Sequence, residues 1–360
     1  AAAGFEPHLA DCSPSLMARM SRTPARVHAY ASPRRAPAWF EADVRQLVED
    51  LHPQLIVPAC EEVFHLALLA ARTGLADRLL APSPATLRDL HSKAQFAQVC
   101  AAAGVLAPST VRAKHRSDLA SVAPAEHVFK PEFSRFGVHT LVGPTRAEVE
   151  RLQPTPQTPW VVQQRIVGEE VSFYAVALEG RLVAFSAYRS AWRLQGGAGY
   201  AFVPVEAQVA DGLHRAASAL AGHVGRGQFA CDAIVDAEGR AWLIECNPRA
   251  TSGVFCFAPA DTLARAMLGS GQAEGEPSLR PHVAPALWRY GLAEALPAGR
   301  LGDWLDQART GRDVVGVQGD RWPVLGALVD SGLFGLRALR RREPLEAAMT
   351  SDIEWNGDLP

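Results

Sequence analysis

Short apolar runs alternate with amphipathic stretches along the first 86 residues. The runs "PQLIVPAC" (53–60) and "DRLLAPS" (77–83), together with "EPHLADC" (6–12), predict buried strands. Residues 37–52 and 61–75 instead space their apolar side chains at the period of a helix. This alternation is typical of a parallel sheet covered by helices. We therefore predict an N-terminal Rossmann-like parallel α/β domain over residues 1–86, whose first strand–helix unit is missing because the chain opens like the end of a helix.

The pattern changes after residue 86, where strands begin to pair with their neighbours in the sequence. Residues 83–104 predict two helices, and "HVFKPEF" (127–133) predicts a strand. Two hairpins follow, one turning at Glu179–Gly180 and one at Glu238–Gly239, with a helix over 211–225 between them. We predict a two-part α+β domain over residues 87–275. Residues 276–360 are expected to be mostly helical.

Composition and charge exclude several classes of protein. The net charge of −2 argues against a nucleic-acid partner. No apolar run is long enough to predict a membrane span. The six scattered cysteines form no C-x-x-C pair, which favours reduced thiols and a cytoplasmic protein over a zinc or disulfide site. Only three lysines stand among 36 basic residues, Lys93, Lys114 and Lys130, so each surviving lysine is of interest.

The stretch "WLIECNPR" (242–249) carries polar side chains in an apolar strand. Residues two apart share one face of a strand, so Glu245 and Asn247 point together while Ile244 and Cys246 point to the core. The hairpin turn brings Asp232 close to Glu245 in register. Mg²⁺ takes oxygen ligands of this kind, and Arg249 lies within reach of a phosphate. A lone acid on a strand is usually just solvated, but three converging oxygen ligands favour a metal site.

These residues resemble the metal-binding hairpin of the ATP-grasp superfamily. The stretch "FACDAIVDAEGRAWLIECNPRATSG" (229–253) is similar to that of D-alanine–D-alanine ligase in its Asp232–Glu245 spacing, and to that of carbamoyl phosphate synthetase and biotin carboxylase in its "NPR". The resemblance implies that residues 87–275 form an ATP-grasp domain. It also implies ATP and two Mg²⁺ ions, with Mn²⁺ as a substitute, held by Asp232, Glu245 and Asn247.

The resemblance also assigns the phosphate-binding residues. Lys130 matches the family's strand lysine and Lys93 its earlier lysine, although an ordinary solvated helix lysine is the stronger alternative for Lys93. The loop "FSRFGVHT" (133–140) stands where the family has a flexible loop over the phosphates. Members are often richer in glycine there. In this loop the implied phosphate-binding residues are Ser134, Arg135 and Gly137.

The stretch "VVQQRIVGEE" (161–170) resembles the segment that holds the adenosine. The resemblance implies backbone contacts to adenine around Arg165 and Ile166, and a side-chain contact from Gln163 or Gln164. Glu170 matches the carboxylate that accepts hydrogen bonds from the ribose hydroxyls. An exposed acidic turn is an equal alternative for Glu169 and Glu170 taken alone.

Candidate substrate residues lie in two further segments. Arg189 and Arg193 precede the glycines of "LQGGAG" (194–199) and are expected on a mobile loop that binds a substrate carboxylate or stabilises an acyl phosphate. Glu61 and Glu62 follow a predicted strand, where ligands of open α/β sheets bind, so they are candidates for a substrate amine. Acids that simply favour the helix dipole are an equal alternative.

Together these features imply an ADP-forming carboxylate–amine ligase. The resemblance implies that a carboxylic acid is activated as an acyl phosphate and joined to an amine, with amino acids among the candidate substrates. Arg249, Arg193 and Arg189 are the candidate catalytic residues. Bicarbonate as the acid, a non-catalytic nucleotide-binding module and another phosphoryl acceptor stay open, as does a homo-oligomer. The helix around 324–342 is expected to pack as an ordinary helix in preference to binding a membrane.

Overall fold

The computed structural model describes residues 3–13, 15–134, 139–194, 197–342 and 345–357. The strands are β1 His8–Asp11, β2 Arg26–Ala29, β3 Thr110–Ala113, β4 His127–Pro131, β5 Leu141–Val142, β6 Trp160–Gln164, β7 Glu169–Leu178, β8 Arg181–Arg193, β9 Gly199–Val203, β10 Gly227–Val235, β11 Ala241–Asn247, β12 Ala273–Glu274, β13 Pro281–His282 and β14 Arg312–Asp313. The α-helices are α1 Leu16–Met20, α2 Pro37–Leu51, α3 Glu62–Thr73, α4 Pro84–His91, α5 Lys93–Ala102, α6 Arg146–Val149, α7 Ala207–Val224, α8 Ala260–Met267, α9 Ala284–Ala286, α10 Leu292–Ala295, α11 Leu301–Thr310, α12 Pro323–Arg341 and α13 Leu345–Thr350.

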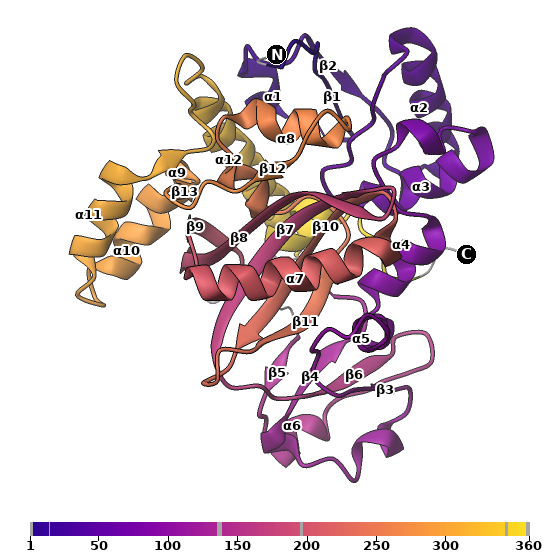
Figure 1. The fold of residues 1–360 in the computed structure, drawn as a ribbon, viewed down its shortest axis with the longest axis vertical. Coiled ribbons are helices and arrows are strands. Elements are labelled where there is room, and N and C mark those ends of the chain that lie inside the picture. Colours follow the sequence, from indigo (N-terminus) through magenta and orange to yellow (C-terminus); the bar gives the residue numbers. More distant parts are fainter. Residues whose placement is uncertain (1–2, 14, 135–138, 195–196, 343–344, 358–360) are drawn as a thin grey trace.

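A large sheet forms the centre of the molecule, with its strands in the order β11-β10-β7-β8-β9-β13-β14 and β12 beside β8 (Figure 1). Strand β7 is buried on both faces because its side chains alternate between two cores. Phe173 packs with Phe229 and Leu220 beneath α7, and Tyr174 packs with Phe257 on the other face. This double burial makes the sheet a rigid base for the residues at its β10–β11 edge.

A second, smaller sheet of four strands in the order β3-β6-β4-β5 forms the lower lobe (Figure 1). Its pairings are antiparallel, and Phe129 and Val162 fill its core. Thr145 is the N-cap of helix α6: its hydroxyl accepts from the Glu148 N–H, and the Glu148 carboxylate accepts from the Thr145 N–H. The two sheets confirm the predicted mixture of helices and strands, and their assignment to one two-part α+β domain stays a prediction. Strand β3 was not predicted.

The N-terminal unit has less sheet than the sequence predicted. Strands β1 and β2 pair in parallel, and residues 53–60 and 77–83 contribute only a parallel bridge between Ile56 and Leu79. Pro53, Pro58 and Pro82 lack a backbone N–H and so limit longer pairing there. Helices α2 and α3 form as predicted, but residues 3–7 contain no helix, so the expected helical opening is wrong. The division at residues 86 and 275 stays a prediction.

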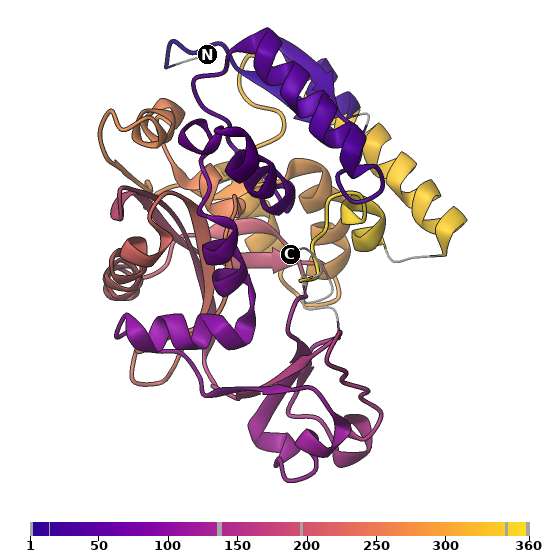
Figure 2. The ribbon, with the colours of Figure 1, turned by 90° about the vertical axis from the view of Figure 1, so that its right-hand side faces the viewer.

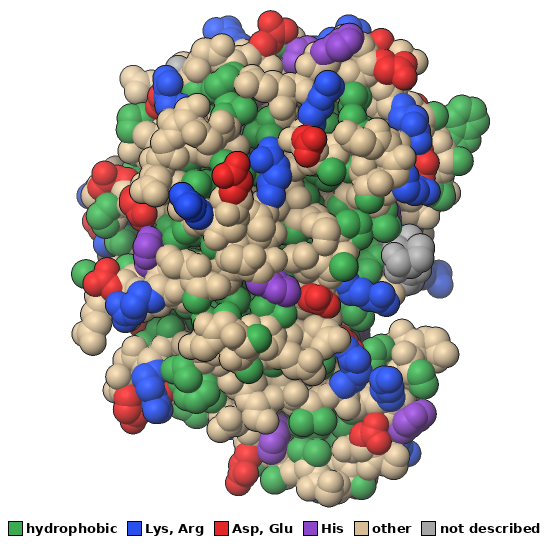
Figure 3. Space-filling model, turned by 45° about the vertical axis from the view of Figure 1, so that its right-hand side comes forward, with side chains coloured by type: hydrophobic (Ala, Val, Ile, Leu, Met, Phe, Trp, Pro, Cys, Tyr) green, Lys and Arg blue, Asp and Glu red, His purple; other side chains and the backbone are tan. Residues whose placement is uncertain are grey.

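The C-terminal region is mostly helical, as predicted, and it packs against the N-terminal unit (Figure 2). Asp330 of α12 accepts hydrogen bonds from the N–H groups of Leu16 (3.0 Å) and Met17 (2.9 Å), so that it caps α1. The opposite face of α12 exposes a row of leucines that includes Leu328 and Leu339. No helix among the described residues is long and apolar enough to cross a membrane. On the face in Figure 3, acidic and basic side chains are interspersed.

Gly168, which precedes β7, gives a test of how closely the β7–β10 pair is packed. A Cβ at this position would lie 2.0 Å from the carbonyl oxygen of Val235, which is backbone and cannot rotate away. We expect Gly168→Ala to lower the free energy of unfolding by about 1–3 kcal/mol in urea denaturation. Gly222→Ala is the matched control, because its Cβ meets nothing within 4 Å on helix α7 and the change should be neutral or stabilising. Equal stability of Gly168→Ala and the wild type would contradict this packing.

Candidate active site

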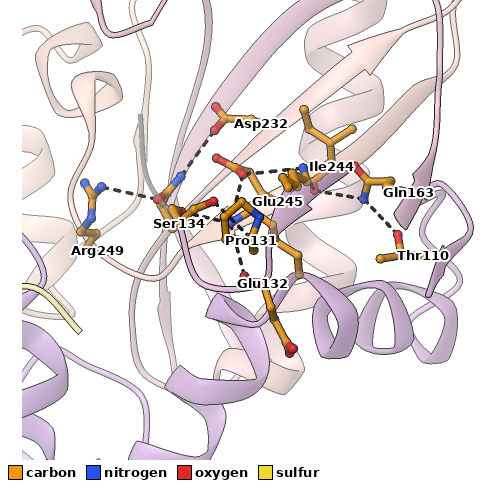
Figure 4. A network of polar contacts seen from close by, with 12 residues as sticks. Thr110, Pro131, Glu132, Ser134, Gln163, Asp232, Ile244, Glu245 and Arg249 are labelled. Carbon is orange, nitrogen blue, oxygen red and sulfur yellow. Dashed lines mark hydrogen bonds and ion pairs between the residues drawn. The ribbon is translucent and has the colours of Figure 1, made fainter. Parts of the chain in front are cut away.

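The β10–β11 hairpin brings the predicted oxygen ligands together. Asp232 pairs directly with Glu245 across the hairpin, which confirms the predicted register (Figure 4). The side-chain amide of Asn247 donates to Asp232 Oδ2 at 3.4 Å. The hydroxyl of Ser172 on β7 donates to Asp232 Oδ1 at 2.6 Å. Two carboxylates and an amide therefore converge at one edge of the large sheet.

A β-bulge in β11 corrects one detail of the sequence prediction. The pairing shifts between Asp232 and Ala233, which leaves Ile244 as an additional residue between Leu243 and Glu245. The bulge interrupts the alternation of side chains, so Leu243 and Cys246 both enter the core with exposed fractions of 1% and 3%. The expectation that Ile244 shares the core face with Cys246 is therefore wrong.

The bulge also presents the carbonyl group of Ile244 to the smaller sheet. Lys130 Nζ on β4 donates to this oxygen at 3.3 Å, and Gln163 Nε2 on β6 lies 3.4 Å from it (Figure 4). Gln163 Nε2 also donates to Thr110 Oγ1 on β3 at 3.0 Å. These contacts join the two sheets at the point where the carboxylates gather.

Only one of the two predicted glutamines lies at this junction. Gln163 is buried and contacts Ile244, whereas Gln164 is exposed. Gln164 lines a separate hollow of about 570 Å³ whose other lining residues are Ser109, Ala125, Glu126, His127, Arg165 and Val167. The backbone N–H of Arg165 already donates to the carbonyl of Glu126 at 2.8 Å. Because the Arg165 N–H is already bonded within the protein, the predicted backbone contacts to adenine would come from the Arg165 carbonyl and from Ile166.

Both predicted lysines reach Glu245. Lys93, the first residue of α5, is 3% exposed, and its Nζ lies 3.5 Å from Glu245 Oε2. Lys130 is 4% exposed, and its Nζ lies 3.8 Å from the same oxygen. The alternative that Lys93 is a solvated helix lysine is thus wrong. Burial lowers the pKa of Lys130 to about 8; the charge of Glu245 opposes this change and that of Lys93 adds to it.

The two carboxylates have opposite pKa shifts. Burial raises the pKa of Glu245, but the ammonium groups of Lys93 and Lys130 outweigh this effect and hold it well below its usual range. Burial and the charge of Glu245 raise the pKa of Asp232 to about 7, against the hydrogen bond from Ser172. Glu245 is therefore ionised while Asp232 keeps part of its proton near neutral pH.

This donor set fits a divalent cation. Two carboxylates repel each other at the edge of the sheet, and a cation between them would remove that repulsion. Asn247 and the two acids offer only oxygen ligands, which suits Mg²⁺ and not a soft metal. Within the described residues there is no cluster of three or more His, Cys, Asp or Glu side chains arranged for a metal.

Sequence reasoning missed the residues that support Lys93. Glu132 is 1% exposed, and it contacts the hydroxyl of Ser92 and the guanidinium of Arg112, whose Nε lies 2.6 Å away. Ser92 is the N-cap of α5 and accepts from the Gln95 N–H at 3.2 Å. The Ser-x-x-Gln spacing of an N-cap signals the helix start at Lys93.

The predicted phosphate loop begins at Phe133, and only its edges belong to the described residues. The carbonyl of Ser134 accepts from Lys93 Nζ at 3.0 Å, and the Ser134 hydroxyl donates to the Pro131 carbonyl at 3.2 Å. Arg135 and Gly137 lie outside the described residues. The Ser134 hydroxyl thus has an acceptor within the protein, and its role toward a phosphate stays a prediction.

The predicted substrate arginines lie on a strand. Arg189 and Arg193 belong to β8, which pairs with β9, so the expectation of a mobile loop is wrong for both. Apolar side chains on both strands pack into a core around Trp192, which extends the pairing. Arg193 forms an ion pair with Glu170 at 2.7 Å, and Arg189 forms one with Glu169 at 2.6 Å. The basic residues therefore neutralise the acids at the start of β7.

Arg249 lies beside the predicted metal ligand Asn247. Its Nη2 lies 3.4 Å from Asn247 Oδ1, and its Nη1 donates to the Ala250 carbonyl at 3.0 Å. Burial alone would lower the pKa of Arg249, but Cys60, Glu61, Glu62 and Asp232 together raise it. The charges at the start of α3 and on the hairpin therefore both act on the guanidinium.

The two candidate acids at the start of α3 have structural partners. Glu62 Oε1 accepts from the N–H groups of Ala59 (2.7 Å) and Cys60 (3.0 Å), and burial raises its pKa despite these bonds. Glu61 Oε2 accepts from the Trp355 N–H at 3.0 Å, and Glu61 is 2% exposed. These bonds support a structural role, and a contact with a substrate amine stays a prediction.

Comparison with known proteins identifies the fold and not the individual protein. No family model matches the chain, and no curated protein matches it either. The L-amino acid ligase from Bacillus licheniformis matches with a TM-score of 0.56 and 13% identity, over 73% of this chain and 74% of that one. Biotin carboxylase from Campylobacter jejuni matches with a TM-score of 0.58 and 11% identity, over 77% and 74% of the two chains.

A third solved structure extends the same result. The N5-carboxyaminoimidazole synthetase from Staphylococcus aureus, complexed with ADP, matches with a TM-score of 0.58 and 14% identity, over 77% of this chain and 74% of that one. The similarity spans most of this chain. The chain has the ATP-grasp fold that these ligases share.

Proposed function

We propose that this protein is an ATP-dependent, ADP-forming ligase that activates a carboxylic acid as an acyl phosphate and joins it to an amine. The observation that carries the proposal is the convergence of Asp232, Glu245 and Asn247 with Lys93 and Lys130. Carboxylates for a divalent cation and ammonium groups for phosphate are what phosphoryl transfer from ATP requires. A protein that only bound nucleotide would not need both.

The smaller sheet and the start of β7 supply the proposed nucleotide contacts. The buried ammonium groups of Lys93 and Lys130 would take the phosphates, with the edge of the loop at Ser134 beside them. Gln163 donates its amide N–H groups toward Thr110 and Ile244. Its side-chain oxygen would then accept a hydrogen bond from the amino group of adenine. Glu170 would accept from the ribose hydroxyls, which requires its ion pair with Arg193 to open or to be shared.

Asp232, Glu245 and Asn247 would hold Mg²⁺, and we propose two ions. When bound, Mg²⁺ neutralises charge on the β- and γ-phosphates and aligns them for transfer. The protein's own residues bind and orient. Lys93 and Lys130 keep Glu245 ionised and ready to ligate, while Ser172 and Asn247 hold the Asp232 carboxylate in place. Mn²⁺ has the same ligand preference and is a candidate substitute.

The proposed reaction proceeds in two balanced steps. An oxygen of the substrate carboxylate attacks the γ-phosphorus, the bond to the bridging oxygen breaks, and ADP leaves. The amine nitrogen then attacks the acyl carbon, phosphate leaves, and the nitrogen releases a proton to solvent. Arg249 lies beside Asn247 and bears a permanent charge, so it would orient the acid and stabilise the acyl phosphate. We assign a more peripheral substrate role to Arg189 and Arg193.

The proposed substrates are a small or medium-sized carboxylic acid and an amine, with amino acids as leading candidates. One of the structurally similar proteins is an L-amino acid ligase, which favours this choice. Glu61 and Glu62 lie near Arg249, where they would face the amine. We further propose that the protein is cytoplasmic and that its cysteines are reduced, since the six cysteines are scattered and form no C-x-x-C pair.

The direct test of the proposed function is a screen for ADP release over pairs of carboxylic acids and amines, with ATP and Mg²⁺ present. The proposal expects ADP release that depends on one acid and one amine together. Bicarbonate belongs among the acids, and a response to bicarbonate alone would favour carboxylation instead. ATP binding with no ADP release over the whole screen would favour a nucleotide-binding module.

Glu245→Gln tests the central carboxylate. The amide is neutral and would ligate a divalent cation more weakly than a carboxylate, so we expect ADP release to fall by about 100-fold or more, measured on variant protein that circular dichroism shows to be folded. Glu238→Gln is the matched control, because Glu238 lies in the turn of the same hairpin and pairs with Arg240 at the surface. Turnover of Glu245→Gln within a fewfold of the wild type would remove Glu245 from the catalytic site.

Asp232→Asn tests the repulsion between the carboxylates through the pH dependence of stability, measured in EDTA. The folded protein holds the Asp232 proton up to about pH 7, whereas the unfolded chain loses it near the usual aspartate pKa of 3.8. Wild-type stability should therefore fall as pH rises from 5 to 7, and Asp232→Asn should remove that fall. We expect the variant to gain about 2 kcal/mol relative to the wild type over this range and no more above it.

Asp236→Asn is the control for this experiment. The pKa of Asp236 is lowered to about 2: burial raises it, but hydrogen bonds from Trp242 and Arg240 prevail. Its contribution to stability is fully present above the usual pKa and is lost only in acid. The difference between Asp236→Asn and the wild type should thus stay constant from pH 5 to 8. A constant difference for Asp232→Asn as well would contradict the raised pKa.

A further inference from the structure

The C-terminal segment, residues 350–357, lies against the N-terminal unit in Figure 2. The carboxylate of Asp352 pairs with Arg35 at 2.8 Å and with Arg337 of α12, and its backbone carbonyl accepts from the Ser32 hydroxyl at 2.7 Å. The Trp355 N–H donates to Glu61 Oε2 at 3.0 Å. These polar contacts hold the C-terminal segment against the N-terminal unit and α12.

Trp355 lies at the centre of an aromatic cluster. Its ring stacks on Phe64 of α3 with a centroid distance of 4.5 Å and an interplanar angle of 13°. It meets Phe133 edge-on at 5.3 Å and His91 of α4 at 5.8 Å. Trp355 is 3% exposed, so the cluster excludes water from its ring. We call Phe64, His91, Phe133 and Trp355 the aromatic cluster.

A second residue of the C-terminal segment also packs on Phe133. A Cβ at Gly357 would lie 2.6 Å from Cε2 of Phe133, and the φ of +81° at Gly357 disfavours any other residue. Phe133 therefore contacts the segment from Trp355 on one side and from Gly357 on another. Phe133 opens the predicted phosphate loop, so the C-terminal segment packs directly on the start of that loop.

Phe133 stands between the two residues that orient Lys93. The carbonyls of Glu132 and Ser134 both face Lys93 Nζ, at 3.5 Å and 3.0 Å. A shift of Phe133 would move both acceptors, because the Glu132 carbonyl belongs to the peptide unit that joins it to Phe133 and Ser134 is the next residue along the chain. The Lys93 ammonium would then lose the acceptors that hold it 3.5 Å from Glu245.

We propose that Trp355 is a positioning residue for the nucleotide site: it fixes Phe133, and through the carbonyls of Glu132 and Ser134 it places the Lys93 ammonium where the ATP phosphates bind. This inference rests on the proposed function, because it gives Lys93 a phosphate to bind. It also assigns a role to the C-terminal region, for which the sequence carried no motif. Trp355 should therefore affect the binding of the phosphates and not the binding of adenosine.

Calorimetric titration of a non-hydrolysable ATP analogue with Mg²⁺, and separately of adenosine, tests this role. Trp355→Ala should weaken binding of the ATP analogue by about tenfold and leave adenosine affinity unchanged. Trp355→Phe keeps an aromatic ring on Phe133 and should recover most of the affinity. Trp39→Ala, at a position 71% exposed on α2, is the matched tryptophan control and should match the wild type.

A double-mutant cycle shows whether Trp355 acts through Lys93. In the Lys93→Ala background, Trp355→Ala should cause no further loss of affinity for the ATP analogue. Equal losses for the analogue and adenosine, or additive losses in the cycle, would overturn the inference. Gly357→Ala should displace Phe133 while Trp355 stays in place. This variant replaces Trp355→Ala in the test if Trp355→Ala does not fold. It should weaken binding of the analogue alone, and unchanged affinity would again overturn the inference.

Two outcomes separate this inference from the proposed function. A wild-type protein that binds no ATP analogue overturns the proposed function, and the inference with it. A wild-type protein that binds the analogue, and loses affinity on Lys93→Ala but not on Trp355→Ala or Gly357→Ala, overturns the inference alone.

Discussion

The burial of two lysines against one glutamate is the constraint on which the rest of the site depends. Lys93 and Lys130 are nearly inaccessible to water, and burying two ammonium groups is costly unless a negative charge and hydrogen-bond acceptors lie close by. Glu245 supplies the charge, and the carbonyls of Ile244 and Ser134 supply acceptors. These groups come from β11, from α5, from β4 and from the loop that follows β4, so the electrostatic requirement holds the two sheets and helix α5 together.

The bulge at Ile244 is the backbone feature that meets this requirement. A regular strand would turn Leu243 to the same face as Glu245 and would point the Ile244 carbonyl along the ladder. The additional residue sends Leu243 and Cys246 into the core and leaves the carbonyl for Lys130 and the side chain of Gln163. The same bulge therefore fills the core of the large sheet and supplies the hydrogen-bond acceptor that joins the two sheets.

Much of the architecture could be predicted from the sequence, because strong local patterns determine it. The 232–245 register followed from a tight hairpin turn, and the helices over 62–73 and 93–102 followed from apolar spacing and caps. The bulge could not be predicted, since it depends on which side chains the core accepts. The pairing of Arg193 with Glu170 joins residues on different strands, and the contact between Trp355 and Phe133 joins residues more than 200 positions apart; neither leaves a local signal.

The fold is shared with an L-amino acid ligase, a biotin carboxylase and an N5-carboxyaminoimidazole synthetase. The fold alone does not identify the substrates, so the chemistry of the first step is the central claim. The most direct measurement uses a carboxylic acid labelled with ¹⁸O, chosen as one that supports ADP release. If the acid attacks the γ-phosphorus of ATP, the phosphate released at the end of the reaction carries one labelled oxygen from the acid. Released phosphate without the label would contradict an acyl phosphate and with it the proposed ligase.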